Sequence, residues 1–227
     1  MSERINEFIE LNKLFKEHGF NLYLVGGTVR DYLLGLPLDD MDVVTDALPE
    51  EIKEFLPSAN FHFAKYGSVQ YKTEKKVKFD ITTLREESSY SDSRHPGEIK
   101  FVKELEVDAK RRDFTVNAMY MDIDLKPIDF YNGLQDLDNR VLRMIGDPDK
   151  RLKEDSLRII RALRFAVDFD LSIEESLGES IKNNAHLLAN LNIDKVKQDI
   201  RKLKGDETKL FALFEIYNIN KFINVID

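Results

Sequence analysis

Hydrophobic positions in the first 145 residues switch repeatedly between a helical period and a strand-like alternation. Residues 3–18 carry Ile5, Phe8 and Phe15 on one side, which predicts an amphipathic helix. A short apolar run at 22–25 and a β-branched run at 42–45 predict strands. The other elements expected in this region are a helix from Thr28 to Leu34, a helix beginning at Pro49, a hairpin made of 67–73 and 77–83, and strands near 99–102 and 118–122.

Two later stretches depart from this pattern. Residues 84–98 contain four serines and Pro96-Gly97, which predicts a mobile loop. From about Asp149 onward the period is helical and no strand is expected; the helical segments are 149–167, 173–187, 193–204 and 207–223. The pattern therefore predicts an α+β fold in two parts, a head over residues 1–145 and an all-helical region over 146–227.

Composition narrows the chemistry by exclusion. Of 227 residues, 42% are hydrophobic and 33% are charged, which is typical of a globular protein and excludes a disordered chain. The absence of cysteine excludes a disulfide framework, a thiolate zinc site and a cysteine nucleophile. The four histidines are scattered along the sequence, so carboxylates are the remaining metal ligands, and these favour Mg²⁺ or Mn²⁺.

Charge and hydropathy indicate whether a membrane or a nucleic acid is expected as a partner. No run approaches the ~20 apolar residues of a membrane helix, and the N-terminus lacks a signal-peptide pattern. We therefore expect a cytoplasmic protein with no membrane partner. The net charge of −8 argues mildly against a nucleic-acid partner. However, residues 195–204 hold five basic side chains and one acid, and residues 150–164 hold six basic side chains and two acids.

The first group of residues with a chemical implication combines the turn Gly26-Gly27 with Asp40 and Asp42. Paired glycines let backbone N–H groups approach a phosphate, and two carboxylates spaced two apart on a strand project from the same face. Such a pair holds divalent cations that activate a hydroxyl nucleophile and neutralise a leaving pyrophosphate. Either feature alone is more often a plain turn or a pair of solvated acids. The ordered set Gly26-Gly27-x-x-Arg30-Asp31 followed by Asp40-x-Asp42 is far more specific and indicates a divalent-metal site suited to phosphate chemistry.

Two further side chains extend this predicted site. Asp80, on the alternating segment 77–83, supplies a third carboxylate if its strand lies beside the strand of Asp42. Arg30, one turn into the helix after the glycines, is placed to meet the charge of a triphosphate. The catalytic candidates are thus Asp40, Asp42 and Asp80, and the metal candidates are Asp40 and Asp42.

The segments LVGGTVRDYLLG and DDMDVVTDALPEEI closely resemble the opening motif of the class II tRNA nucleotidyltransferases, the family of CCA-adding enzymes and bacterial poly(A) polymerases. The resemblance covers roughly residues 20–190. It implies a polymerase-β-like nucleotidyltransferase head with a mixed sheet, followed by an all-helical neck. It also implies Mg²⁺ on Asp40 and Asp42, with Gly26, Gly27 and Arg30 at the incoming nucleotide.

A second motif is KRRDFTVNAM at residues 110–119. Two arginines can clamp a triphosphate, and an adjacent carboxylate can accept a hydrogen bond from a ribose hydroxyl. From the residues alone, a salt-bridged surface patch is the more frequent interpretation. The motif resembles the family's Arg-Arg-Asp, which recognises ribose and phosphate. By position, Arg112 and Asp113 take those roles.

A third motif contains Asp155, Arg158, Arg161 and Arg164 in a segment with a helical period. At about 100° per residue, Arg158 and Arg161 fall on a polar face together with Asp155. Ion pairs on a solvated face are the usual interpretation of such a pattern. The segment resembles the family motif in which an Asp and an Arg pair with the base of CTP or ATP. This implies base recognition by Asp155 and Arg158, with Arg161 and Arg164 supporting the nucleotide and the helix.

The resemblance implies transfer of CMP and AMP from CTP and ATP to the 3′ end of tRNA. Residues 84–97 resemble the family's flexible loop, which favours an enzyme able to add the terminal A. Ser156 stands where poly(A) polymerases tend to carry proline. A-only addition, poly(A) synthesis and a non-catalytic RNA- or nucleotide-binding module are the alternatives.

Members of the family usually continue into further helical regions that grip the tRNA. We therefore expect the basic segment Lys195–Lys204 to bear more of the RNA binding in this chain. Because this contribution is electrostatic, the expected tRNA affinity is weak and depends strongly on salt.

Overall fold

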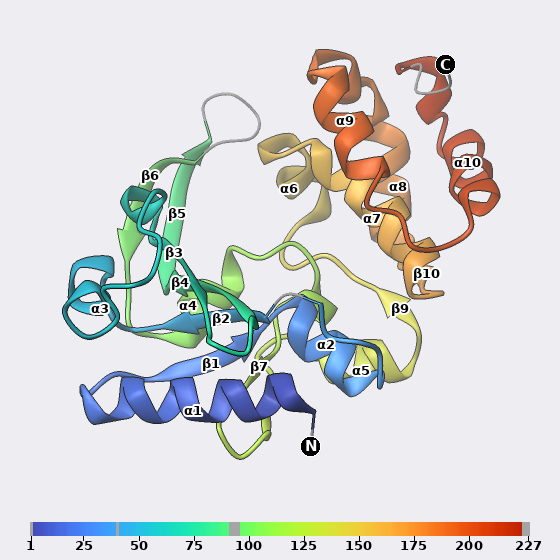
Figure 1. Cartoon of the computed structure of the whole chain (residues 1–227). Helices are drawn as coiled ribbons and strands as arrows, with labels where there is room; N and C mark the ends of the chain where they lie inside the picture. Colours follow the sequence, from blue (N-terminus) through green and yellow to red (C-terminus); the bar gives the residue numbers. More distant parts are fainter. Residues whose placement is uncertain (1, 40, 91–95, 224–227) are drawn as a thin grey trace. The chain divides into compact units, whose positions relative to one another are not determined.

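A computed structural model describes residues 2–39, 41–90 and 96–223 of the chain (Figure 1). The chain divides into two compact units. The first takes in Met1–Ser88, Glu98–Arg112 and Val116–Gly133, and the second takes in Ser89–Gly97, Asp113–Thr115 and Leu134–Asp227. The expected division at residue 145 into a catalytic head and a base-reading neck stays a prediction.

The first unit is built on a six-stranded mixed sheet with the strand order β3-β4-β2-β1-β7-β8. The strands are β1 (Leu22–Val25), β2 (Met41–Thr45), β3 (Ser68–Lys72), β4 (Lys78–Thr83), β7 (Tyr120–Met121) and β8 (Pro127–Ile128). Strands β2 and β4 run parallel, whereas the other neighbouring pairs are antiparallel. The strands predicted at 22–25 and 42–45 and the predicted hairpin are confirmed.

Alternation along the central strands places a row of buried apolar residues and the acids Asp42 and Asp80 on opposite faces of the sheet. Leu24, Val43 and Ile81 lie side by side in the register and are fully buried. Successive side chains on a strand point to opposite faces. Asp42 and Asp80, each one position before a buried residue, therefore project together from the other face of the sheet.

The helices of the first unit are α1 (Glu3–Glu17), α2 (Gly27–Leu33), α3 (Pro49–Phe55) and α4 (Leu105–Lys110), with short turns η1 (Ala64–Tyr66) and η2 (Thr115–Asn117). The buried Asn12 of α1 donates from Nδ2 to the carbonyl of Leu22 at 2.6 Å, which fixes α1 against β1 (Figure 1). The hydroxyl of Thr28 accepts from the backbone N–H of Asp42 at 2.8 Å. This bond fixes the start of α2 beside β2.

The predicted loop over 84–98 is wrong at both of its ends. Strands β5 (Arg85–Tyr90) and β6 (Pro96–Phe101) form a two-stranded sheet, and residues 91–95 lie outside the described residues. The loop prediction rested on the serine content, whereas strand formation depends strongly on neighbouring strands and packing. Two contacts fix the base of this hairpin. The N–H of Val102 donates to the carbonyl of Leu84 at 2.9 Å, and Arg85 pairs with Glu87 at 2.8 Å.

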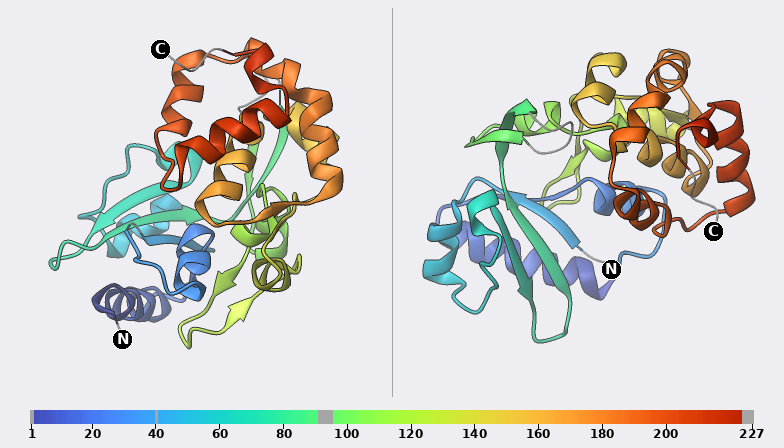
Figure 2. Two further views of the ribbon diagram at one scale, coloured as in Figure 1. Left: turned by 90° about the vertical axis from the view of Figure 1, so that its right-hand side faces the viewer. Right: turned by 90° about the horizontal axis from the view of Figure 1, so that it is seen from above.

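The second unit is mainly helical, and its helices from α6 onward are drawn in gold to red in Figures 1 and 2. Its elements are α5 (Gly133–Asp138), β9 (Val141–Leu142), α6 (Pro148–Glu154), α7 (Leu157–Asp168), β10 (Ser172–Ile173), α8 (Glu175–Asn184), η3 (Ala185–Asn190), α9 (Ile193–Ile200), α10 (Glu207–Ile216) and η4 (Ile219–Lys221). Helix α7 is central, because Ile159, Ile160 and Leu163 are fully buried and the helix packs against α6, α9 and α10. None of the helices within the described ranges combines the length and apolar character needed to span a membrane.

Two expectations for this unit are wrong. The helix predicted over 149–167 is interrupted at Asp155, which has extended backbone angles of φ −145° and ψ 98°. The Asp155 side chain accepts from the N–H of Leu157, and such local bonds compete with helix continuation. No strand was expected after Asp149, but β10 pairs in parallel with β9. Ser172 makes this possible by donating its backbone N–H and its hydroxyl to the carbonyl of Arg140.

Candidate active site

The turn between β1 and α2 brings the backbone close to three predicted site residues. Gly26 has φ +62°, in the left-handed region that favours glycine. A Cβ on Gly26 would lie 3.3 Å from Nη1 of Arg112. A Cβ on Gly27 would lie 3.4 Å from Nη2 of Arg30 and 4.0 Å from Oδ2 of Asp42, which are ordinary contacts. The backbone angle therefore favours glycine at the first position, and a Cβ there would also press tightly on the guanidinium group of Arg112.

Asp42 and Asp80 are partners in the register of the parallel strands β2 and β4. The condition attached to Asp80 in the sequence, that its strand lie beside that of Asp42, is therefore met. Asp42 is exposed, whereas Asp80 is half-buried and accepts a hydrogen bond from Nε2 of Gln70 at 2.9 Å. One face of the sheet thus carries two neighbouring carboxylates.

Asp40, the other predicted catalytic and metal-binding carboxylate, lies outside the described residues. In the part of the chain that the structure describes, no three acidic or histidine side chains gather closely enough to hold a metal ion. Asp42 and Asp80 nevertheless supply oxygen donors, which Mg²⁺ and Mn²⁺ prefer, on one sheet face. The donor chemistry fits magnesium, and the assignment of Asp40 and Asp42 as its ligands stays a prediction.

Arg30 lies close to Gly27 of the glycine turn, and only 6% of its surface is exposed. Its Nε and Nη2 donate to Oδ1 of Asp31 at 2.9 and 2.7 Å, and its Nη1 donates to Oδ1 of Asn117 at 2.5 Å. These bonds fix the guanidinium plane near Gly27. Asn117 is a residue that the sequence did not single out, because 87 positions separate it from Arg30 and no local pattern links them.

Arg112 and Arg111 share the carboxylate of Asp108, which has no exposed surface. Oδ2 of Asp108 accepts from Nε and Nη2 of Arg112 at 3.1 and 2.8 Å, and Oδ1 accepts from Nε of Arg111 at 2.9 Å. Burial alone raises the pKa of Asp108, but the charges of Arg112 and Arg111 outweigh burial and lower that pKa to about 2. Burial alone lowers the pKa of Arg112, and the attraction to Asp108 outweighs it and raises that pKa. Arg112 is charged at any physiological pH, and the ion pair with Asp108 holds this charge beside Gly26.

Asp113, which follows Arg112 directly, belongs to the second unit. Its Oδ1 accepts from the N–H of Phe114 at 2.8 Å, and its Oδ2 accepts from Nε of Arg161 at 2.9 Å and from Nη2 of the same residue. The attraction to Asp113 raises the pKa of Arg161. Two residues predicted separately to contact the nucleotide are thus joined by an ion pair. The sequence did not predict this contact, which links positions 48 apart.

Asp155 and Arg158 do not lie on one continuous helix, so the helical projection that placed them together is wrong. Asp155 ends α6, and its Oδ1 accepts from the N–H of Leu157 at 3.1 Å. Arg158 is buried, and its Nη1 donates to the carbonyl of Arg151 at 2.7 Å and lies 3.5 Å from Oε2 of Glu154. Base recognition by Asp155 and Arg158 stays a prediction.

Arg164 joins α7 to α9. Its Nη1 donates to Oδ2 of Asp168 at 3.0 Å, and its Nη2 lies 3.5 Å from Oδ1 of Asp199 on α9. Its guanidinium carbon lies 4.4 Å from the centre of the Phe165 ring. These contacts account for the predicted support of the helix, whereas the predicted support of the nucleotide is untested.

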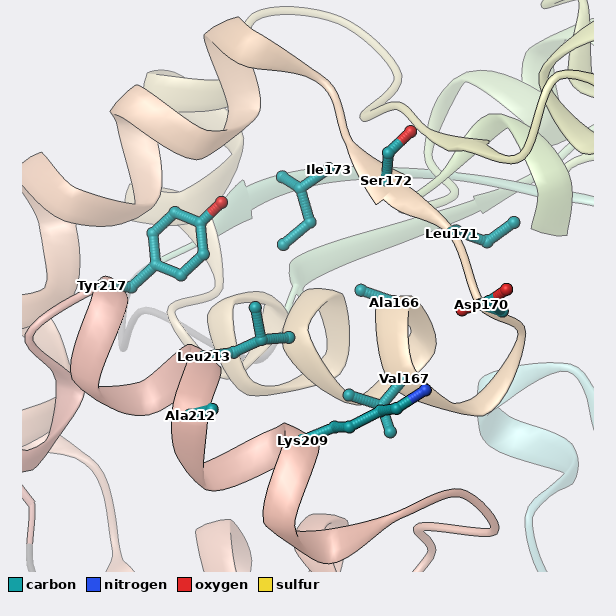
Figure 3. A pocket seen from close by; sticks show the side chains of 10 residues that line it. All are labelled: Ala166, Val167, Asp170, Leu171, Ser172, Ile173, Lys209, Ala212, Leu213 and Tyr217. Carbon is teal, nitrogen blue, oxygen red and sulfur yellow. The ribbon is translucent and has the colours of Figure 1, made fainter.

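A pocket in the second unit contains none of the predicted site residues (Figure 3). Its volume is about 350 Å³, and it is lined by Ala166, Val167, Asp170, Leu171, Ser172, Ile173, Lys209, Ala212, Leu213 and Tyr217. The lining is mainly aliphatic and comes from α7, the segment leading into β10, and α10 (Figure 3). It lacks the paired carboxylates and arginines that nucleotidyl transfer uses.

The family described as poly A polymerase head domain matches residues 22–143. The CCA-adding enzyme of Ligilactobacillus salivarius (strain UCC118) is 43% identical over 188 residues, which cover 83% of this chain and 46% of that enzyme. The CCA-adding enzyme of Lactococcus lactis subsp. cremoris (strain MG1363) is 41% identical over 202 residues, which cover 87% of this chain and 50% of that enzyme.

Solved structures give the same result. The crystal structure of the Bacillus stearothermophilus CCA-adding enzyme in complex with CTP matches with a TM-score of 0.88 and 32% identity, covering 98% of this chain and 54% of the other. The Thermotoga maritima CCA-adding enzyme complexed with tRNA matches with a TM-score of 0.77 and 27% identity, covering 98% of this chain and 53% of the other. The chain spans about half the length of the relatives it matches.

Fold and sequence lead to one family. The α+β fold with its mixed sheet and following helices confirms the predicted fold class. The segments Gly26-Gly27 and Arg112-Asp113 both lie inside the matched residues 22–143. The chain belongs to the family of class II tRNA nucleotidyltransferases and bacterial poly(A) polymerases.

Proposed function

We propose that this chain carries the catalytic part of a magnesium-dependent enzyme that adds CMP and AMP from CTP and ATP to the 3′ end of tRNA, producing CCA. One observation carries the proposal. Asp42 and Asp80 lie opposite each other in the register of β2 and β4, so both carboxylates project from one face of the sheet, next to the glycine turn beside Arg112. The curated relatives are CCA-adding enzymes. Solved relatives include complexes with CTP, with tRNA, and with a primer tRNA and an incoming ATP analogue.

In the proposed reaction, the 3′-oxygen of the tRNA forms a bond to the α-phosphorus of the nucleotide, and the bond from that phosphorus to pyrophosphate breaks. The hydroxyl proton passes to solvent. Asp42, Asp80 and Asp40 would hold magnesium, which when bound neutralises phosphate charge and favours ionisation of the attacking hydroxyl.

The phosphates of the nucleotide are assigned to the glycine turn and its arginines. Gly26 leaves open the space beside Nη1 of Arg112, which any side chain at that position would enter. Arg112 is fixed by Asp108 and remains charged, and a charged guanidinium is a strong donor to phosphate oxygens. Arg30 keeps its guanidinium near Gly27 in the same way through Asp31. The turn and both arginines therefore suit a polyanionic ligand.

Sugar and base recognition is assigned to the second unit. Oδ2 of Asp113 is held by Arg161, which fixes the carboxylate, and a carboxylate oxygen can accept a hydrogen bond from a ribose hydroxyl. Asp155 offers acceptors and Arg158 offers donors, and such groups distinguish base edges by complementary hydrogen bonds. We therefore assign ribose recognition to Asp113 and the choice between cytosine and adenine to Asp155 and Arg158.

Contact with tRNA is assigned to the basic segment Lys195–Lys204. Its acid, Asp199, is 3% exposed and pairs with Arg164 and with Lys202, whereas the side chains of Arg201, Lys202 and Lys204 are exposed. The exposed charged side chains at the end of this segment are therefore basic. Exposed lysines and arginines bind nucleic-acid phosphates without sequence preference.

Incubation with Mg²⁺ and labelled CTP or ATP tests the function, using tRNAs that end before C, after C and after CC. We expect incorporation of C on the first two tRNAs and of a single A on the third. Incorporation of A alone would identify an A-adding enzyme, and long A tails would identify a poly(A) polymerase. Nucleotide binding with no incorporation on any tRNA would contradict the catalytic proposal and favour a binding module.

A further inference from the structure

Asp108 is a fully buried acid near the proposed phosphate site, and it lies outside the three sequence motifs and has no assigned contact with the nucleotide. It lies on α4, four positions before Arg112, and its side chain has no exposed surface. Placing a carboxylate in the interior is costly unless it is paired and hydrogen-bonded. Here the carboxylate accepts bonds from Arg111, Arg112 and the hydroxyl of Tyr120, the last at 2.8 Å. Its bonding capacity is therefore largely directed at the Arg-Arg motif.

The bonds determine how Arg112 is oriented. Asp108 takes Nε and Nη2 of Arg112, and the Tyr120 oxygen also accepts from Nε at 3.2 Å. The guanidinium carbon lies 5.3 Å from the centre of the Tyr120 ring, so the ring supports one face of the group. The other terminal nitrogen, Nη1, lies beside Gly26. A guanidinium held along one edge by a carboxylate presents its other edge in a fixed direction.

The same carboxylate gives the two adjacent arginines different roles. Arg111 binds Oδ1 of Asp108, and its Nη1 donates to Oε1 of Glu87 at 3.0 Å. Arg111 is therefore held between two carboxylates of the protein. Arg112 instead reaches the glycine turn. The sequence motif alone does not distinguish the two arginines.

We propose that Asp108, supported by Tyr120, is a positioning residue that holds Arg112 against the Gly26 turn so that its Nη1 edge receives a phosphate of the incoming nucleotide. This inference rests on the proposed function, because it requires a nucleoside triphosphate at that turn. Asp108 itself does not touch the nucleotide. Its effect on binding must therefore pass through Arg112.

That requirement defines the experiment. The equilibrium Kd for CTP in Mg²⁺ is measured for the unsubstituted chain, Asp108→Asn, Arg112→Lys and the double variant, together with the thermal midpoint of each. Asparagine keeps the shape of Asp108 but removes its charge, so Arg112 loses a charge-assisted pair. We expect Asp108→Asn to weaken CTP binding about tenfold in the unsubstituted chain and less than about twofold in the Arg112→Lys chain, because coupled residues are not additive.

Tyr120→Phe provides a milder variant that keeps the buried ring and removes only the hydroxyl. It should weaken CTP binding about threefold, since the hydroxyl's bonds to Asp108 and from Arg112 are lost while the ion pair itself remains. Asp46→Asn is the matched control. Asp46 is a half-buried acid of the same unit that accepts from Asn21 at 2.8 and 2.7 Å, and its replacement should leave the CTP Kd unchanged.

Three results would overturn the inference while leaving the proposed function standing. These are an unchanged CTP Kd in both Asp108→Asn and Tyr120→Phe, an equal loss with and without Arg112, or a lowered thermal midpoint with no change in Kd. Failure of the unsubstituted chain to bind CTP would instead contradict the proposed function, and the inference with it. The two failures are therefore distinguished by the unsubstituted chain alone.

Discussion

Arg112 in the first unit and Arg164 in the second are both held by buried aspartates, but their surroundings differ. Arg112 is paired along one edge by Asp108, and its Nη1 lies beside the Gly26 turn. Arg164 places one terminal nitrogen on Asp168 and the other near Asp199. Both of those aspartates are almost completely buried, at 2% and 3% side-chain exposure. The first arginine is oriented toward a turn, whereas the second is enclosed between two helices.

Because the partners of these two arginines differ, the presence of an arginine in a motif does not by itself establish its function. In the first unit the neighbouring acids Asp42 and Asp80 lie on an accessible sheet face, with Asp42 exposed. In the second unit the acids around Arg164 face inward and join α7 to α9. The placement of the carboxylates therefore separates a group suited to a ligand from a group that stabilises the fold. Four substitutions or titrations test this separation.

The largest effect is expected for Asp42→Asn. Removal of a magnesium ligand costs several kcal/mol of transition-state stabilisation, which corresponds to a loss of nucleotide transfer on the order of 10³-fold. Because Asp42 is exposed, the urea midpoint should not change. Single-turnover transfer and urea unfolding measure the two quantities. Asp124→Asn, on an acid whose side chain is 70% exposed, is the control and should alter neither.

Arg164→Met should show the opposite pattern. Loss of the guanidinium removes the positive charge that Asp168 and Asp199 share in the interior, although Asp168 keeps the N–H groups of Lys204 and Gly205 and Asp199 keeps Lys202. Breaking a buried pair in this way costs about 3 kcal/mol of unfolding free energy. Urea unfolding measures this, with Arg201→Met as a control at an exposed position of the same region. A loss of CTP affinity with unchanged stability would place Arg164 with the ligand-binding arginines and end the contrast with Arg112.

Asp155→Asn tests the base recognition that is proposed for the second unit. Asparagine retains an oxygen that accepts from the N–H of Leu157, so the start of α7 keeps its cap. The second carboxylate oxygen is replaced by a donor, which changes the pattern presented to a base edge. We expect the ratio of C to A incorporation to shift about tenfold, as for loss of one good base contact. Competition between CTP and ATP on the same tRNA measures this ratio, and an unchanged ratio would remove Asp155 from base recognition.

The smallest expected effect is on the pH dependence of the unfolding free energy. The pKa of Asp108 in the fold is about 2, below the ~3.9 of an aspartate in an unfolded chain. A lowered pKa in the fold means that ionised Asp108 stabilises the protein above pH ~4, and that this contribution is lost as the pH falls toward 2. The unfolding free energies of the unsubstituted chain and of Asp108→Asn should therefore lie about 1 kcal/mol closer at pH 3 than at pH 5. A difference that stays constant over this range would show that Asp108 is not held as the anion.

The sequence predicted the elements that depend on short-range patterns. Strands β1 and β2, the hairpin of β3 and β4, and α1 follow from alternation and helical period, and all are confirmed. The same alternation led to the prediction that Asp80 joins the site if its strand lies beside the strand of Asp42. The two residues are register partners, so this condition is met. The roles assigned to both acids remain proposals, because they depend on a ligand and not on the fold.

The features that escaped prediction depend on particular side-chain contacts. The break at Asp155 arises because its carboxylate caps Leu157, a competition that an average helical period does not register. The aspartate's known preference for caps was the available signal. Asp108 also carried a signal, its spacing of three and four from Arg111 and Arg112. Asn117 lies inside the segment KRRDFTVNAM, but nothing in that segment indicated its contact with Arg30, which forms only in the folded chain.

Binding of Mn²⁺ in the presence of CTP, followed through the electron paramagnetic resonance signal of the free ion, tests most directly whether the accessible acids of the sheet form the catalytic metal site. We predict that the unsubstituted chain binds Mn²⁺, that Asp42→Asn weakens this binding about 100-fold, and that Arg164→Met leaves it unchanged in the folded protein. Equal Mn²⁺ affinity in the unsubstituted and Asp42→Asn chains would contradict the assignment of Asp42 as a metal ligand, and with it the proposed transfer mechanism.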